Sequence, residues 1–114
     1  MRVAGIGFRG SAGAAAICDA LGGAQVDALA TLQRKADALR AFDLGWPVIG
    51  VSDVEIAAMQ TPSHSERVFA QLGTGSLAEA AALVAAGPDA RLLVTRRISS
   101  DGMATAAIAE GQDL

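Results

Sequence analysis

The hydrophobic and polar positions of the chain follow two periods, one typical of β-strands and one typical of α-helices. Short apolar runs predict five strands, at residues 2–6, 26–32, 47–51, 91–95 and 103–109. Between these runs, apolar residues recur at intervals of three and four, as in Ala14, Ile17, Cys18 and Leu21, which indicates amphipathic helices. Strands and helices therefore alternate along most of the chain.

Helix boundaries follow from capping residues and from glycine and proline. Ser11 is expected to begin a helix that ends at Leu21, and a second helix is expected over residues 34–44. Three S-x-x-E patterns are typical of capping boxes and predict helices that begin at Ser52, Ser63 and Ser76. A turn at 100–102 joins the last two strands into an antiparallel pair, and residues 111–114 are expected to form a polar tail.

This order of elements predicts an α/β fold with a mixed sheet of about five strands and helices on both of its faces. The 114 residues fit one domain, residues 1–114. Much of the apolar content is alanine, which buries little area per side chain. Modest stability, assisted by self-association into a homo-oligomer, is therefore expected.

Charge and cysteine content exclude several classes of partner. The net charge is −3, and no run of Lys and Arg exceeds two residues, which argues against nucleic acid or an anionic membrane surface. The single cysteine, Cys18, lies on an apolar helix stripe and is expected in the core. Without an internal disulfide, a signal peptide or an apolar run of membrane-spanning length, the protein is predicted to be cytoplasmic.

A glycine-rich stretch, Gly5-Ile6-Gly7-Phe8-Arg9-Gly10, matches the G-x-G-x-x-G spacing of dinucleotide-binding turns. The chain is too short for the two halves that a dinucleotide spans, and Arg9 lies where the backbone approaches a pyrophosphate. We therefore expect a strand-to-helix turn, with Gly7 at the end of the strand, whose free amides suit a carboxylate or phosphate.

A second stretch, Gly73-Thr74-Gly75-Ser76, precedes an alanine-rich helix. It has no P-loop lysine, so nucleotide hydrolysis is not expected. Ser76 and Glu79 fit a capping box, which leaves Gly73 and Gly75 unexplained. Two interpretations stay open, a structural turn alone and a turn that also binds an anion.

A third candidate lies at the end of the second strand, where open α/β sheets bind ligands. Thr31 is expected to present its hydroxyl there, and Lys35, the only lysine, follows in the first turn of a helix, where it opposes the helix dipole. Lys35 is either a functional cation or a solvated surface residue. His64 is expected on the surface, and no metal site, cofactor or catalytic triad is indicated.

Three segments together resemble the CobE/CbiG C-terminal domain family of cobalamin biosynthesis: VAGIGFRGSAGA, LATLQRKAD, and GTGSLAEAAALVAAG followed by RLLVTRR. The resemblance covers nearly the whole chain and implies a three-layer α/β/α domain. In this family the domain occurs in hydrolases that open the lactone of cobalt-precorrin 5A and also as a free-standing form, which this sequence is similar to.

The family resemblance implies that the ligand is a precorrin or a tetrapyrrole like hydrogenobyrinic acid, an apolar macrocycle with a fringe of carboxylates. The two glycine-rich segments, with Arg9, Lys35 and either Arg96 or Arg97, would then bind the carboxylates. Phe8 would contact the ring. The expected ligand-binding set is Gly7, Phe8, Arg9, Ser11, Thr31, Lys35, Gly73, Thr74, Gly75, Ser76, Glu79 and Arg96.

Two alternatives to ligand binding stay open. One is a hydrolase that acts on a precorrin lactone or on its carbon-20 fragment, with Lys35, Glu79 or Thr31 as acid–base or water-orienting groups. The other is a subunit that docks onto another enzyme of cobalamin biosynthesis. The sequence alone identifies no catalytic residue.

Overall fold

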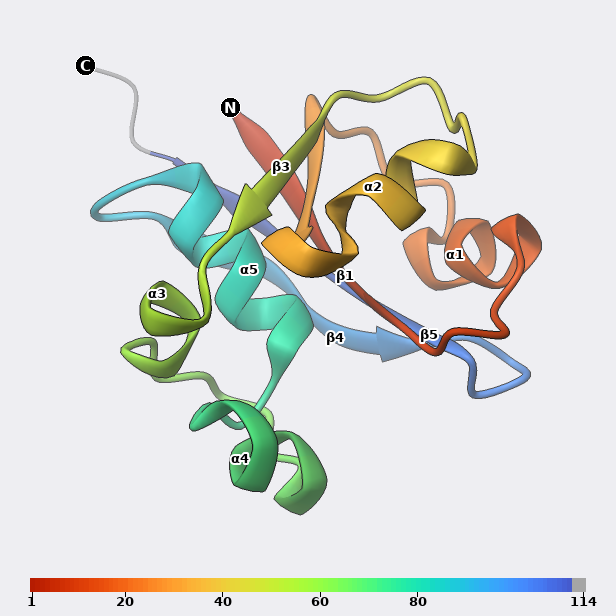
Figure 1. Cartoon of the computed structure of the whole chain (residues 1–114). Coiled ribbons are helices and arrows are strands. Elements are labelled where there is room, and N and C mark those ends of the chain that lie inside the picture. Colours follow the sequence, from red (N-terminus) through yellow and green to blue (C-terminus); the bar gives the residue numbers. More distant parts are fainter. Residues whose placement is uncertain (112–114) are drawn as a thin grey trace.

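A computed structural model describes residues 1–111 of the chain (Figure 1). The predicted polar tail, apart from Gly111, lies outside the described residues. Along the chain the elements are β1 (Arg2–Phe8), α1 (Ala14–Leu21), β2 (Ala28–Leu32), α2 (Gln33–Ala41), β3 (Val48–Val51), α3 (Asp53–Ala57), α4 (Glu66–Leu72), α5 (Leu77–Ala86), β4 (Arg91–Ile98) and β5 (Ala104–Glu110).

The strands form one mixed sheet in the order β3-β2-β1-β5-β4. β1, β2 and β3 pair in parallel, and β5 pairs antiparallel with both β1 and β4. Four of the five strands therefore end at the same edge of the sheet, and β5 begins there. This edge is called the carboxyl edge below. The predicted α/β class and the antiparallel last pair are confirmed.

Helices cover both faces of the sheet, so the three-layer architecture is also confirmed. On one face, α1 and α2 bury Ile17, Leu21 and Leu39 against β1, β2 and β5. On the other face, α3 and α5 bury Ile56 and several alanines against β1, β2 and β3. Since β2 is covered on both faces, all five of its residues are buried.

The alanine-rich composition of α5 follows from how closely this helix approaches β1. A Cβ atom added at Gly5 would lie 1.8 Å from the carbonyl oxygen of Ala78 and 2.7 Å from the backbone nitrogen of Ala82. Gly7 faces the same side, where a Cβ atom would lie 2.7 Å from Oγ1 of Thr105. Small residues on both elements let the two backbones pack almost in contact.

Three boundary predictions are wrong, two near the N-terminus and one at the start of α4. β1 continues to Phe8, so Gly7 lies within the strand and not at its end. Helix α1 begins after Gly13, and Ser11 caps nothing, because the chain makes a further turn before the helix starts. Helix α4 is capped by Ser65, whose hydroxyl accepts from the backbone nitrogen of Val68, and not by Ser63.

Cys18 lies on the exposed side of α1, which corrects the prediction of a core cysteine. The stripe that packs on the sheet runs through Ala16, Ile17, Ala20 and Leu21 instead. Within residues 1–111 no single helix is long and apolar enough to cross a bilayer, and α4 and α5 meet that criterion only as a pair bent by 54°.

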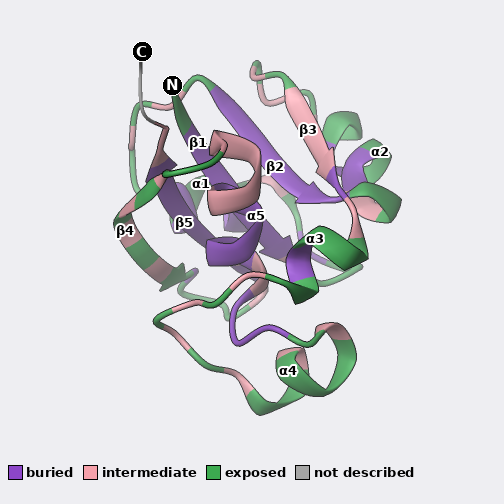
Figure 2. Cartoon of the chain, turned by 90° about the vertical axis from the view of Figure 1, so that its left-hand side faces the viewer, coloured by how far each residue is buried: buried purple, intermediate pink, exposed green. Residues whose placement is uncertain are grey.

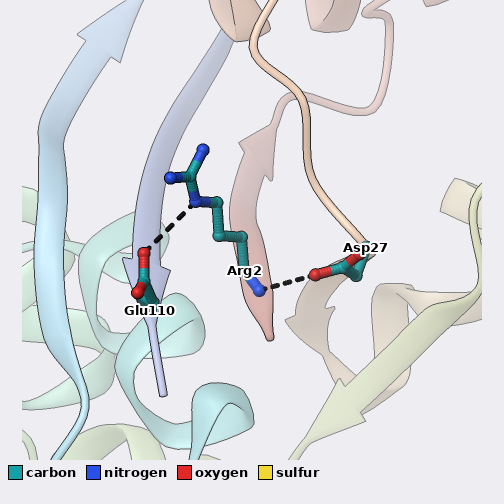
Figure 3. A network of polar contacts seen from close by, with 3 residues as sticks. All are labelled: Arg2, Asp27 and Glu110. Carbon is teal, nitrogen blue, oxygen red and sulfur yellow. Dashed lines mark hydrogen bonds and ion pairs between the residues drawn. The ribbon is translucent and has the colours of Figure 1, made fainter. Parts of the chain in front are cut away.

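The sheet edge opposite the carboxyl edge is held by an exposed polar network (Figure 3). The backbone nitrogen of Arg2 donates to Oδ2 of Asp27 at 2.8 Å, and Nε of Arg2 donates to Oε2 of Glu110 at 3.2 Å. These bonds join the start of β1 to the segment before β2 and to the end of β5. They supplement the strand pairing at this edge of the sheet.

The turn between β4 and β5 is held by two carboxylates. Asp19 of α1 accepts hydrogen bonds from the backbone nitrogen of Ser100 at 2.6 Å and from its hydroxyl at 2.9 Å. Asp101 accepts from the hydroxyl of Ser99 at 2.6 Å and from the backbone nitrogen of Met103 at 3.0 Å. In each case these donors favour the charged form and lower the carboxyl pKa.

The lowered pKa values predict a specific sensitivity to acid. A carboxyl whose pKa is lower when folded stabilises the fold above its unfolded value, and this stabilisation is lost as the pH falls through the folded pKa. Asp19→Asn and Asp101→Asn should therefore destabilise the protein at neutral pH, and the difference from wild type should shrink below about pH 3.9, the ordinary aspartate pKa. Urea unfolding of wild type and variants at neutral pH and below about pH 3.9 measures this difference in stability. A difference that is the same at both pH values would contradict the prediction.

Candidate functional site

A cavity of about 630 Å³ opens at the carboxyl edge of the sheet. Its floor is formed by the ends of β1, β2 and β4 and by the start of β5. One wall comes from the first turn of α2, and the opposite wall comes from residues 64–72 and the start of α5. This is the position where open α/β sheets bind ligands, and the volume lies within the range of small-molecule sites.

The cavity lining is strongly basic although the chain as a whole is acidic. Five of the nine Lys and Arg residues line the cavity, together with the only histidine, and these residues are Arg9, Arg34, Lys35, Arg67, Arg96 and His64. No Asp or Glu is among the lining residues. The local field therefore favours an anion, and the net charge of −3 is carried elsewhere on the molecule.

Three of these six residues are already engaged, and one of them is His64, whose Nε2 lies 3.3 Å from Oε1 of the exposed Glu66. Arg34 pairs with Asp53 of α3 through an N–O distance of 2.6 Å, with both side chains more than half exposed. Nζ of Lys35 donates to the carbonyl oxygen of Phe8 at 2.9 Å and lies 4.3 Å from the centroid of its ring. Within residues 1–111, Arg9, Arg67 and Arg96 have no ion-pair partner. These three guanidinium groups are available to bind an anion.

The cavity also has an apolar surface. Phe8 lies at its floor, and its ring packs edge-on against Phe42 with centroids 5.9 Å apart. The other large apolar side chains of the lining come from five separate elements or loops, and they include Leu32, Leu72, Leu77, Ile98 and Met103. Ile98, at the end of β4, is 59% exposed. The arrangement suits a ligand with an apolar body and an anionic fringe.

Sequence-predicted site residues fall into two groups. Seven line the cavity: Gly7, Phe8, Arg9, Thr31, Lys35, Ser76 and Arg96. Five do not: Ser11, Gly73, Thr74, Gly75 and Glu79. Of the two alternatives offered for one cation, Arg96 faces the cavity, whereas the guanidinium of Arg97 donates to the carbonyl oxygen of Leu21 at the end of α1.

The segment Gly73–Ser76 serves mainly to connect α4 to α5. Gly73 ends α4 in the left-handed conformation, at φ 77°, and the hydroxyl of Thr74 donates to the carbonyl oxygen of Met59 at 2.8 Å. A Cβ atom at Gly75 would lie 2.5 Å from the carbonyl oxygen of Ser63, so the backbone there passes directly under residues 61–64. Ser76 caps α5 and is the one residue of this segment in the lining.

The three groups considered as acid–base residues are engaged within the protein. The hydroxyl of Thr31 donates to the carbonyl oxygen of Ile6 at 2.8 Å, and Nζ of Lys35 donates to Phe8. Glu79 is fully buried and accepts three hydrogen bonds, described below. Within the described part of the chain, no group of three or more His, Cys, Asp or Glu residues is arranged to hold a metal ion.

Sequence reasoning missed the wall formed by residues 64–72. His64 was expected on the surface, and its ring does lie half exposed beside Phe69, yet it also lines the cavity. Arg67 and Gln71 line the cavity from α4. Their four-residue spacing indicates that both side chains lie on the same face of the helix. The direction of that face depends on how α4 sits on the body, which no local pattern specifies.

These features define an α/β/α domain with a cation-lined, ligand-sized cavity at the carboxyl edge of its sheet. The family model described as Cobalamin synthesis G C-terminus matches residues 2–109, so the chain belongs to this family. It is a cobalamin biosynthesis protein.

Solved structures agree with this assignment. The chain is similar to the crystal structure of CobE, a protein from the cobalamin (vitamin B12) biosynthetic pathway, with 32% identity and a TM-score of 0.78, over 96% of this chain and 89% of that one. It is also similar to the cobalamin biosynthesis protein chiG from Agrobacterium tumefaciens, with 35% identity and a TM-score of 0.71, over 99% of this chain and the whole of that one. None of the curated proteins matches the sequence.

Proposed function

We propose that this protein binds a precorrin or corrin carrying free carboxylates in the cavity at the carboxyl edge, and holds it for another enzyme of cobalamin biosynthesis. The observation that carries the proposal is the composition of the lining: five Lys and Arg residues, one His and no carboxylate in an acidic chain. Membership of the cobalamin family supplies the ligand class.

The distribution of charge over the cavity supports a large, flat ligand better than a small anion. Arg9 follows β1, Arg96 lies on β4 and Arg67 lies on α4, so the three available guanidinium groups come from three separate segments, two at the floor of the cavity and one in its wall. A single small anion would satisfy one such group. Carboxylates spread around a macrocycle would satisfy all three while the ring covers the apolar surface between them.

A pigment titration tests the proposal. Hydrogenobyrinic acid, which has free carboxylates, should bind with a shift in its visible absorption and should migrate with the protein in gel filtration. The matched control is the same macrocycle with its carboxylates amidated, which should bind far more weakly because an amide carries no charge and cannot form the bidentate ion pair that a carboxylate forms with arginine. Equal affinity for both pigments, or no binding of the acid at high micromolar concentration, would contradict the proposal.

A further inference from the structure

Residues 61–76 form a flap over one side of the cavity. Helix α4 lies at its centre and contains no buried residue, and the cartoon shows it projecting from the body of the molecule (Figure 2). The flap nevertheless supplies His64, Arg67 and Gln71 to the lining. Residues 74–76 are buried, but no residue of 61–73 is, so this part of the flap needs specific polar contacts to hold it in place.

Those contacts converge on Glu79 of α5. Its Oε1 accepts from the backbone nitrogen of Ser63 at 2.8 Å, and its Oε2 accepts from the hydroxyl of Ser63 at 2.7 Å and from the backbone nitrogen of Arg96 at 2.8 Å. The side chain is 0% exposed and, within residues 1–111, has no cationic partner. Only half of the capping box with Ser76 therefore forms. The hydroxyl of Ser76 accepts from the backbone nitrogen of Glu79, but the Glu79 side chain does not bond back to Ser76.

Burial of a carboxylate without a cation is costly, and here three hydrogen bonds offset the cost. The bonds join the start of the flap to β4. Arg96 supplies one of the three donors, and His64 is the residue after Ser63, which supplies the other two. Arg67 lies in the first turn of α4, shortly after His64. The position of Glu79 thus links the wall formed by the flap to the part of the floor formed by β4.

We propose that Glu79 is a positioning residue: its buried carboxylate fastens the flap to β4 and so holds Arg67 in place opposite Arg96. The anchoring itself concerns the free protein. Its consequence for ligand affinity rests on the proposed function.

Hydrogen exchange of the free protein tests the anchoring. Ser63→Ala removes one of the three hydrogen bonds and leaves two donors on the carboxylate. Amides of residues 64–72 should then exchange about tenfold faster, as expected for loss of a hydrogen bond to a charged group, while amides of β1 and β2 keep their wild-type rates. Ser100→Ala is the matched control, since it removes a hydrogen bond between a serine and a carboxylate, that of Asp19, at the turn between β4 and β5. Unchanged exchange in 64–72, or equal acceleration everywhere, would overturn the anchoring.

A double-mutant cycle with hydrogenobyrinic acid tests the consequence for binding. Ser63→Ala should weaken binding mainly through faster dissociation, and this loss should largely disappear in an Arg67→Gln background, because the flap acts through Arg67. Additive losses would overturn the positioning role. If the wild-type protein binds no pigment, the proposed function fails, and the exchange experiment still decides whether Glu79 anchors the flap.

Discussion

Gly5→Ala is expected to remove a large fraction of the stability of this domain. The added methyl carbon would lie 1.8 Å from the carbonyl oxygen of Ala78 and 2.9 Å from its carbonyl carbon. Both atoms belong to the backbone of α5, so no side-chain rotation relieves the overlap, and the helix must move away from β1. Overpacking of this kind costs about 3 kcal/mol or more, a large fraction of the 5–15 kcal/mol that typically stabilises a domain.

Urea unfolding followed by circular dichroism measures the loss, and the chain contains a matched control. Gly10 lies in the turn after β1, and a Cβ atom there meets nothing within 4 Å. Gly10→Ala changes the same atoms with no overlap and should keep the midpoint close to wild type. Similar midpoints for Gly5→Ala and Gly10→Ala would show that the contact between α5 and β1 is looser than described.

The same contact explains which parts of the fold the sequence could predict. The number and order of the strands, the hairpin and the serine caps of α3 and α5 all depend on neighbouring residues, and these predictions hold, although β1 and β4 extend beyond their predicted ends. The G-x-G-x-x-G spacing predicts a turn after a strand that ends at residue 6. In the structure Gly7 also lies in β1, and the small size of Gly5 and Gly7 lets α5 pack closely, although this helix is 70 or more residues away in sequence. A local pattern specifies that glycine is needed, but not which distant element approaches it.

The S-x-x-E patterns illustrate the same limit for polar residues. In Ser52–Glu55 both halves of the capping box form, because the helix start is exposed and nothing else competes for the carboxylate. In Ser76–Glu79 the serine caps the helix, but burial places Glu79 beside Ser63 and the backbone of β4. The sequence therefore identifies the start of α5 correctly and assigns the wrong partner to its glutamate.

The candidate site divides along the same line. Arg9, Lys35 and Arg96 follow or end strands, so their place at the carboxyl edge could be predicted from strand order alone. Arg67 could not, because it reaches the cavity only through the path of the flap. The wall that carries it is set by tertiary hydrogen bonds, and these leave no periodic signal.

Neutralising the cations is expected to produce the largest loss of ligand binding. Arg9→Gln, Arg67→Gln and Arg96→Gln each remove one available guanidinium group while keeping a side chain of similar length. Each should weaken binding of hydrogenobyrinic acid by about 1.5–3 kcal/mol, a factor of roughly 10–150, the range for a hydrogen bond to a charged group. Isothermal titration calorimetry or the absorption titration measures the loss.

Arg91→Gln is the matched control, because Arg91 begins the same strand that carries Arg96 but lies at the opposite edge of the sheet, outside the cavity lining. It changes the net charge of the protein by the same amount. If attraction between the pigment and the whole molecule caused the binding, Arg91→Gln and Arg96→Gln would weaken it equally. Binding in the cavity requires that Arg96→Gln lose affinity and Arg91→Gln keep it, since a contact charge acts at a few ångströms whereas a remote exposed charge is screened by salt.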